Sequence, residues 1–91
     1  MTIGGVTYNQ EQLLDILRQA NSKDATLMLA AQLIAAKLNV LNGAYAGSIT
    51  DTINNADAFL VAHPLGSELQ EEERDYAIDL KDLLDDFNNG D

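Results

Sequence analysis

Apolar residues recur every three or four positions along most of the chain, a spacing that places side chains on one face of an α-helix. Four such segments each follow a residue suited to cap a helix, and most end at a glycine or a proline. The pattern predicts helices over residues 9–20, 24–41, 49–62 and 68–88. It therefore indicates an all-α fold, either a compact four-helix bundle or an irregular helical array, in a single domain over residues 1–91.

Capping residues set the expected helix boundaries, because their side chains can accept hydrogen bonds from the first free backbone amides of a helix. The first helix should fade near Asn21 and Ser22, and residues Ile3 to Thr7 could pair briefly as an extended arm. The expected caps, in chain order, are Thr7 or Asn9, Ser22 or Asp24, Ser48 with Asp51 three residues later, and Ser67 with Gln70 three residues later.

The second helix is the most apolar segment and should be the central buried helix. It is shorter than the 20 or so apolar residues that a membrane span needs, and Gln32, Lys37 and Asn39 interrupt it. Gln32 and Asn39 lie on one face, where they would fix helix register, satisfy loop backbone or face a partner. The expected core is Leu13, Leu14, Leu17 and Ala20 in the first helix, Leu27, Met28, Leu29, Leu33, Ile34, Leu38 and Leu41 in the second, Ile49, Ile53, Ala56 and Leu60 in the third, and Leu69, Tyr76, Leu80, Leu83, Leu84 and Phe87 in the fourth.

Negative charge is concentrated near the C-terminus. The chain has a formal net charge of -10, and residues 64–91 hold ten acids against two bases, a net of -8. Clustered lysines and arginines are what hold phosphates, so binding to nucleic acid or to an anionic membrane surface is not expected. With no cysteine, the chain has no disulfides, thiolate metal ligands or thiol nucleophiles.

Projection of the fourth helix places six acids within an arc of roughly 80°, beside the apolar face. Like charges four residues apart destabilise a helix, an effect that a Lys81–Asp85 pair would partly offset. Three interpretations stay open: a solvated surface, a dock for a basic protein partner, and a surface for divalent cations. This acidic stripe consists of Glu68, Glu72, Asp75, Asp79, Asp82 and Asp86.

Calcium is the cation that the acids near the C-terminus would suit best, because it prefers oxygen ligands. An EF-hand alignment with Gly90 at the sixth position fails, since Phe87 then occupies a ligand position. A loose, weak site at the end of the helix is the remaining form of this hypothesis. Its candidate ligands are Asp79, Asp82, Asp85 and Asp86, with Asn88, Asn89 and Asp91 nearby.

Catalytic chemistry is not expected. His63 is the single histidine and lies just before Pro64, where a surface or capping role competes with a pH-sensitive contact or a metal-binding role. Gly4 and Gly5 lack the residues that complete a phosphate-binding loop, and the few aromatic residues could not line a sugar cleft. We therefore expect no enzyme activity and no cofactor, with a minor hydrolase as the weakest hypothesis.

Several segments resemble one known kind of module. The run Gln32-Leu33-Ile34-Ala35-Ala36-Lys37-Leu38-Asn39, the later Asn42-Gly43-Ala44, Ala56-Asp57-Ala58 after Ile53, and Leu84-Asp85-Asp86-Phe87-Asn88-Asn89-Gly90 together resemble the C-terminal part of a module of unknown function from secreted and cell-surface bacterial proteins. Val6-Thr7-Tyr8 and Leu13-Leu14 are similar to its lead-in, so the resemblance covers residues 3–90. It implies export and a multidomain surface context, but no activity.

These observations favour a non-enzymatic structural or interaction module of an extracellular or cell-surface bacterial protein. Its partner would be another protein or a neighbouring domain of the same polypeptide. The segment Met1 to Gly5 has no basic residues and no long apolar run, so it does not resemble a signal peptide. The alternative is a small acidic intracellular regulator that binds a basic protein or mimics nucleic acid.

Overall fold

Helices account for most of the chain, which the computed structural model describes at residues 1–19 and 23–90. The described part contains strands β1 (Thr2–Ile3) and β2 (Val6–Thr7) and helices α1 (Gln10–Arg18), α2 (Ala25–Leu41), α3 (Ile49–Ala62) and α4 (Glu71–Asn88). The predicted all-α class is confirmed. The expected end of the first helix at Ala20 and its fading at Asn21 and Ser22 lie outside the described residues.

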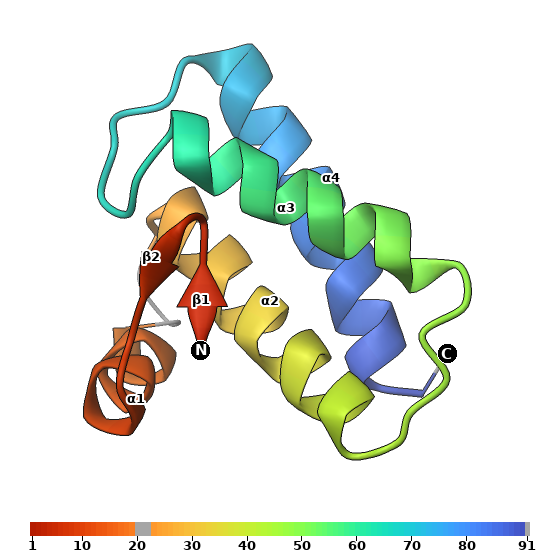
Figure 1. Cartoon of the computed structure of the whole chain (residues 1–91). Coiled ribbons are helices and arrows are strands. Elements are labelled where there is room, and N and C mark those ends of the chain that lie inside the picture. The colour runs from red at the N-terminus through yellow and green to blue at the C-terminus, as the bar shows by residue number, and fades with distance from the viewer. Residues whose placement is uncertain (20–22, 91) are drawn as a thin grey trace.

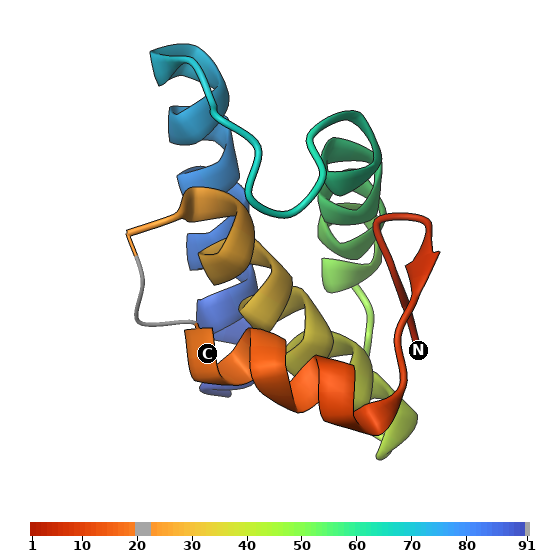
Figure 2. The ribbon, with the colours of Figure 1, turned by 90° about the vertical axis from the view of Figure 1, so that its left-hand side faces the viewer.

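Helices α2, α3 and α4 pack side by side, and α3 runs in the direction opposite to the other two (Figures 1 and 2). Helix α2 packs most extensively against α4 and then against α3. Helix α1 lies across the end of this group and contacts α2, so it does not complete a regular four-helix bundle (Figure 2). The structure therefore corresponds to the irregular helical array of the two predicted arrangements.

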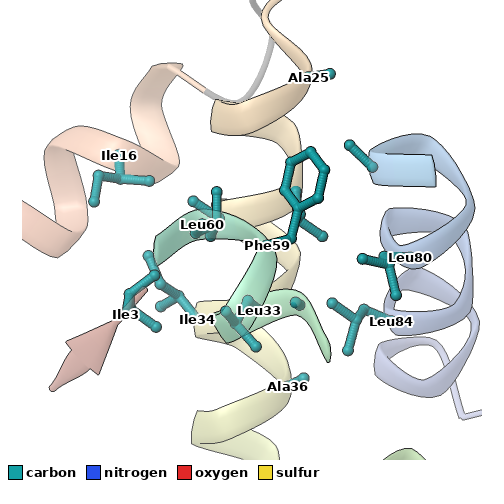
Figure 3. Close-up of a cluster of buried hydrophobic side chains, with 14 of the residues drawn as sticks. Ile3, Ile16, Ala25, Leu33, Ile34, Ala36, Phe59, Leu60, Leu80 and Leu84 are labelled. Carbon is teal, nitrogen blue, oxygen red and sulfur yellow. The ribbon is translucent and has the colours of Figure 1, made fainter. Parts of the chain in front are cut away.

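The hydrophobic core lies where α2, α3 and α4 meet. Leu33 and Ile34 of α2 and Leu60 of α3 belong to one buried cluster, and Leu80 and Leu84 extend from α4 into it (Figure 3). Fully buried alanines let the helix backbones approach closely, which side chains of leucine size would prevent. These alanines are Ala30 and Ala36 in α2, Ala56 in α3 and Ala77 in α4.

Several predicted core residues are instead exposed. Leu38 and Leu41 in the last turns of α2 are 41% and 76% exposed, because the core contacts of this helix end at Ala36. In α1 the buried residue is Ile16, while Leu14 and Leu17 are exposed. Helix α1 packs mainly on α2, so only a narrow stripe of its surface is covered. Tyr76 and Leu83 of α4 are also about half exposed, and Phe59 joins the core in their place.

Two of the four expected caps are confirmed and two are wrong. Asn9 caps α1 in a reciprocal pair with Gln12, and Asp24 accepts a hydrogen bond from the backbone of Thr26 at the start of α2. Ser48 makes no side-chain capping bond, because its own backbone is already helical, at φ -73° and ψ -12°. A capping serine needs an extended backbone to reach the free amides that follow it.

The fourth helix begins three residues later than predicted, at Glu71. Ser67 does not cap it, because both its backbone N–H and its hydroxyl donate to the carbonyl of Pro64 and close a turn. Gln70 precedes the first helical residue, and its backbone N–H donates to Glu73 Oε1 at 2.8 Å. The buried hydroxyl of Thr26 accepts from the N–H of Gly66 at 2.9 Å, which anchors this connection to α2.

The N-terminal residues pair as a hairpin, as the sequence indicated, with Ile3 opposite Val6. Asp57 of α3 fastens the hairpin to the helices. One carboxylate oxygen accepts from the N–H of Gly4 at 2.9 Å, and the other lies 2.6 Å from Lys37 Nζ. Lys37 also donates to the carbonyl of Thr2 at 2.7 Å. One ion pair thereby joins the hairpin, α2 and α3.

Amide side chains fix the register between α2 and α4. Asn88 Nδ2 donates to the carbonyl and to Oε1 of Gln32, at 3.0 and 2.7 Å, and its Oδ1 accepts from Asn39 Nδ2 at 2.9 Å. Of the roles predicted for Gln32 and Asn39, helix register is therefore the one that the contacts support. A shift of α4 by one turn would break all three bonds, so the arrangement specifies one alignment.

Candidate functional site

Helix α4 has two contrasting faces. Ala77, Leu80 and Leu84 are buried against α2 and α3. The other face carries the stripe acids that lie within α4, and every residue of the stripe is exposed. Helical spacing separates the two faces, so the core contacts hold the carboxylates outward in solvent.

Glu68 does not belong to the helical part of the stripe. It lies in the connection before α4, which begins at Glu71, so the predicted alignment of Glu68 with Glu72 on one helical face is wrong. The four aspartates of the stripe keep the predicted spacing, because Asp75, Asp79, Asp82 and Asp86 all lie within α4. They form a line about 16 Å long at 1.5 Å per residue.

Most of the stripe carries no compensating positive charge. Lys81 lies 2.7 Å from Asp82, not beside Asp85 as predicted. Elsewhere in the described residues, Arg18 pairs with Asp15 and Lys37 pairs with Asp57. Across residues 1–19 and 23–90, the other stripe acids have no ion pair or side-chain hydrogen bond: Glu68, Glu72, Asp75, Asp79 and Asp86.

The candidate calcium ligands are not assembled into a cluster. No three aspartate, glutamate or histidine side chains in the described part of the chain lie close enough together to hold a metal ion. Asp82 is paired with Lys81, and Asp85 accepts a hydrogen bond from Asn89 at 3.3 Å. Asp79 and Asp86 remain exposed on the stripe, and Asp91 lies outside the described residues.

His63 links the end of α3 to the start of α4. Its ring centroid lies 4.6 Å from that of Phe59, and its Nε2 lies 3.3 Å from Glu73 Oε2. Phe59 in turn contacts Tyr76, at 5.7 Å between ring centroids. The half-buried histidine therefore packs between two helices beside a single carboxylate, an arrangement that supports a structural contact.

The surface of the described residues includes two hollows that are large enough to receive apolar side chains. The first, which we call the α3–α4 groove, has a volume of about 390 Å³ and lies beside the stripe, lined by Ser48, Ile49, Thr52, Leu83, Asp86 and Phe87. The second, of about 440 Å³, lies between the hairpin, α2 and α3 and is lined by Met1, Thr2, Lys37, Val40, Leu41, Ala46, Thr50 and Ile53. Sequence reasoning missed both, since neither has a motif.

Comparisons with protein-family models, with curated proteins and with solved structures return no match for this chain. None of the helices in the described residues is both long enough and apolar enough to span a bilayer. What the geometry offers is an exposed line of aspartates on a helix packed against α2 and α3, next to an apolar groove.

Charge repulsion along the stripe should lower the stability of the fold. Asp79 lies four residues from Asp75 and three from Asp82, so replacing it with asparagine is expected to raise the free energy of unfolding by about 0.2–0.5 kcal/mol per relieved pair. Urea unfolding at low salt measures the gain, which should shrink at high salt.

A matched control, Asp51→Asn, is expected to change the free energy of unfolding in the opposite direction. Asp51 lies in the first turn of α3, where its charge interacts favourably with the helix dipole, so Asp51→Asn should lower stability slightly. If Asp79→Asn also lowers stability at low salt, the stripe is not a site of net repulsion.

Proposed function

We propose that this chain is a non-enzymatic interaction module that binds a basic protein partner through the acidic stripe. The single observation that carries the proposal is the exposure of the stripe aspartates on α4, of which only Asp82 has an ion pair in the described residues. A line of uncompensated charge costs stability, and a partner with lysines or arginines would remove that cost on binding.

The setting that we propose for the module is an extracellular or cell-surface bacterial protein. The resemblance noted in the sequence supports this setting. A small acidic intracellular regulator would use the same surface, so the two settings differ in location and not in chemistry. Cell fractionation of a tagged chromosomal copy separates them, because the regulator would remain in the cytosol.

Charge-neutral variants test the interaction itself. The stripe variant combines Asp75→Asn, Asp79→Asn, Asp82→Asn and Asp86→Asn. The control carries the same change in net charge at exposed acids elsewhere, through Glu11→Gln, Asp15→Asn, Asp51→Asn and Glu71→Gln.

Cross-linking in cells followed by mass spectrometry compares the partners of the two variants with those of the wild type. We expect the stripe variant to lose a partner that the control retains. The proposal fails if both variants retain every partner, or if both lose them equally, since the second result would reflect net charge alone.

A further inference from the structure

The α3–α4 groove is continuous with the acidic stripe, because Asp86 belongs to both. Its floor and walls include Ile49 and Phe87, and Leu83 stands at its edge with 52% of its surface exposed. On α4, Leu83 follows Asp82 and lies four residues from Asp79, so it occupies the boundary between the charged line and the packed face. A partner that touches the aspartates would also meet this leucine.

The charge around the groove selects its occupant. Helix α3 contains no lysine or arginine, and on α4 Lys81 is paired with Asp82. Arg74, the other base of α4, lies in its first turns and donates to the carbonyl of Lys23, away from the groove at the opposite end of the helix. The groove therefore lies in a negative field. A second copy of this chain would bring another net charge of -10, which opposes self-association at this face. The hollow beside the hairpin has no such selectivity, because its charged lining residue Lys37 is already paired with Asp57.

We propose that the α3–α4 groove binds an amphipathic helix of a partner protein, whose apolar face covers Leu83 and Phe87 and whose lysines or arginines meet Asp79, Asp82 and Asp86. This inference rests on the proposed function and adds the shape and chemistry of the partner segment. The aspartates repeat at intervals of three and four residues, as the facing side chains of a second helix do. Two packed helices also form a groove into which a third helix can dock.

A synthetic peptide of about 18 residues, long enough to form a helix, provides the probe. This helical peptide carries leucines on one face and lysines beside them. A scrambled peptide has the same composition but no separate apolar and basic faces. Titration of the full 91-residue chain, followed by NMR amide shifts, locates the contact without any substitution. We expect the helical peptide to shift Ile49, Leu83 and Phe87 and to bind more tightly than the scrambled one.

Leu83→Asp is the decisive variant, because it removes apolar contact while adding a charge that a purely electrostatic partner would favour. We expect it to weaken binding of the helical peptide about tenfold or more. Leu14→Asp on α1 is the matched control, since Leu14 is similarly exposed, at 41%, and lies on another helix, and it should leave the affinity unchanged.

Other results overturn the inference in distinguishable ways. Equal binding of both peptides, with no loss for Leu83→Asp, would mean that the stripe acts by charge alone, which leaves the proposed function standing. Shifts confined to Val40 and Ile53 would place the peptide in the hollow beside the hairpin. No binding by either peptide would also reject the groove, while the cross-linking experiment would still decide the proposed function separately.

Discussion

Replacing Leu33 with alanine is expected to lower the free energy of unfolding by about 2–5 kcal/mol. Leu33 is fully buried in the middle of α2, in the cluster that α3 and α4 complete (Figure 3). Removing one methine and two methyl carbons leaves a cavity that the surrounding helices cannot close, because buried alanines already hold their backbones near contact. For a domain of this size the loss is a large share of total stability. Urea unfolding followed by circular dichroism measures it.

Leu41→Ala is the matched control for this experiment. Leu41 is on the same helix and has the same side chain, but it is 76% exposed. The free energy of unfolding should change by less than about 0.5 kcal/mol, as for most surface substitutions. Similar losses for Leu33→Ala and Leu41→Ala would contradict the position of the core along α2.

Gly4→Ala is expected to be the most costly substitution in the hairpin, at about 2–4 kcal/mol. Gly4 has a φ of +57°, a region that residues with a Cβ atom rarely adopt, and an added Cβ would lie 2.6 Å from the Cβ of Leu60. The backbone of α3 holds Leu60 in place, so the hairpin would have to move away. That movement would stretch the hydrogen bond from Gly4 N–H to Asp57.

Gly43→Ala separates the cost of a positive φ from the cost of a close contact such as the one with Leu60. Gly43 also has a positive φ, at +97°, but no atom lies within 4 Å of its added Cβ. Its cost should be backbone strain alone, about 1–2 kcal/mol. Thermal unfolding of Gly4→Ala and Gly43→Ala gives the difference between their losses of stability. Equal losses would show that Leu60 does not constrain the hairpin.

Helix periodicity and capping residues were enough to predict the class and most boundaries. The third helix begins at Ile49 and ends at Ala62, as predicted, and the second helix is one residue shorter than predicted. The errors in the caps arise where the local backbone or a local turn decides the outcome. Ser67 could cap a helix by its residue type, but its hydroxyl closes the turn with Pro64 instead.

The extent of the core could not be predicted from one helix at a time. Leu38 and Leu41 are as apolar as Leu29 and Leu33, and only the positions of α3 and α4 distinguish the exposed pair from the buried one. The acidic stripe was easier to predict, because repulsion and hydration keep aspartates on the surface whatever the fold. The α3–α4 groove could not be predicted without the structure, since its two walls, residues 48–52 and 83–87, are more than 30 residues apart in sequence.

The placement of α1 has a consequence for local unfolding. This helix packs mainly on α2 through Ile16 and the half-buried Leu13, whereas α3 and α4 also pack on each other. Detaching α1 exposes little apolar surface and leaves the contacts among the other three helices intact. Its amides should therefore exchange with solvent hydrogen through a partial opening, at a lower free energy than the amides around Leu33, which are released only when the whole domain unfolds.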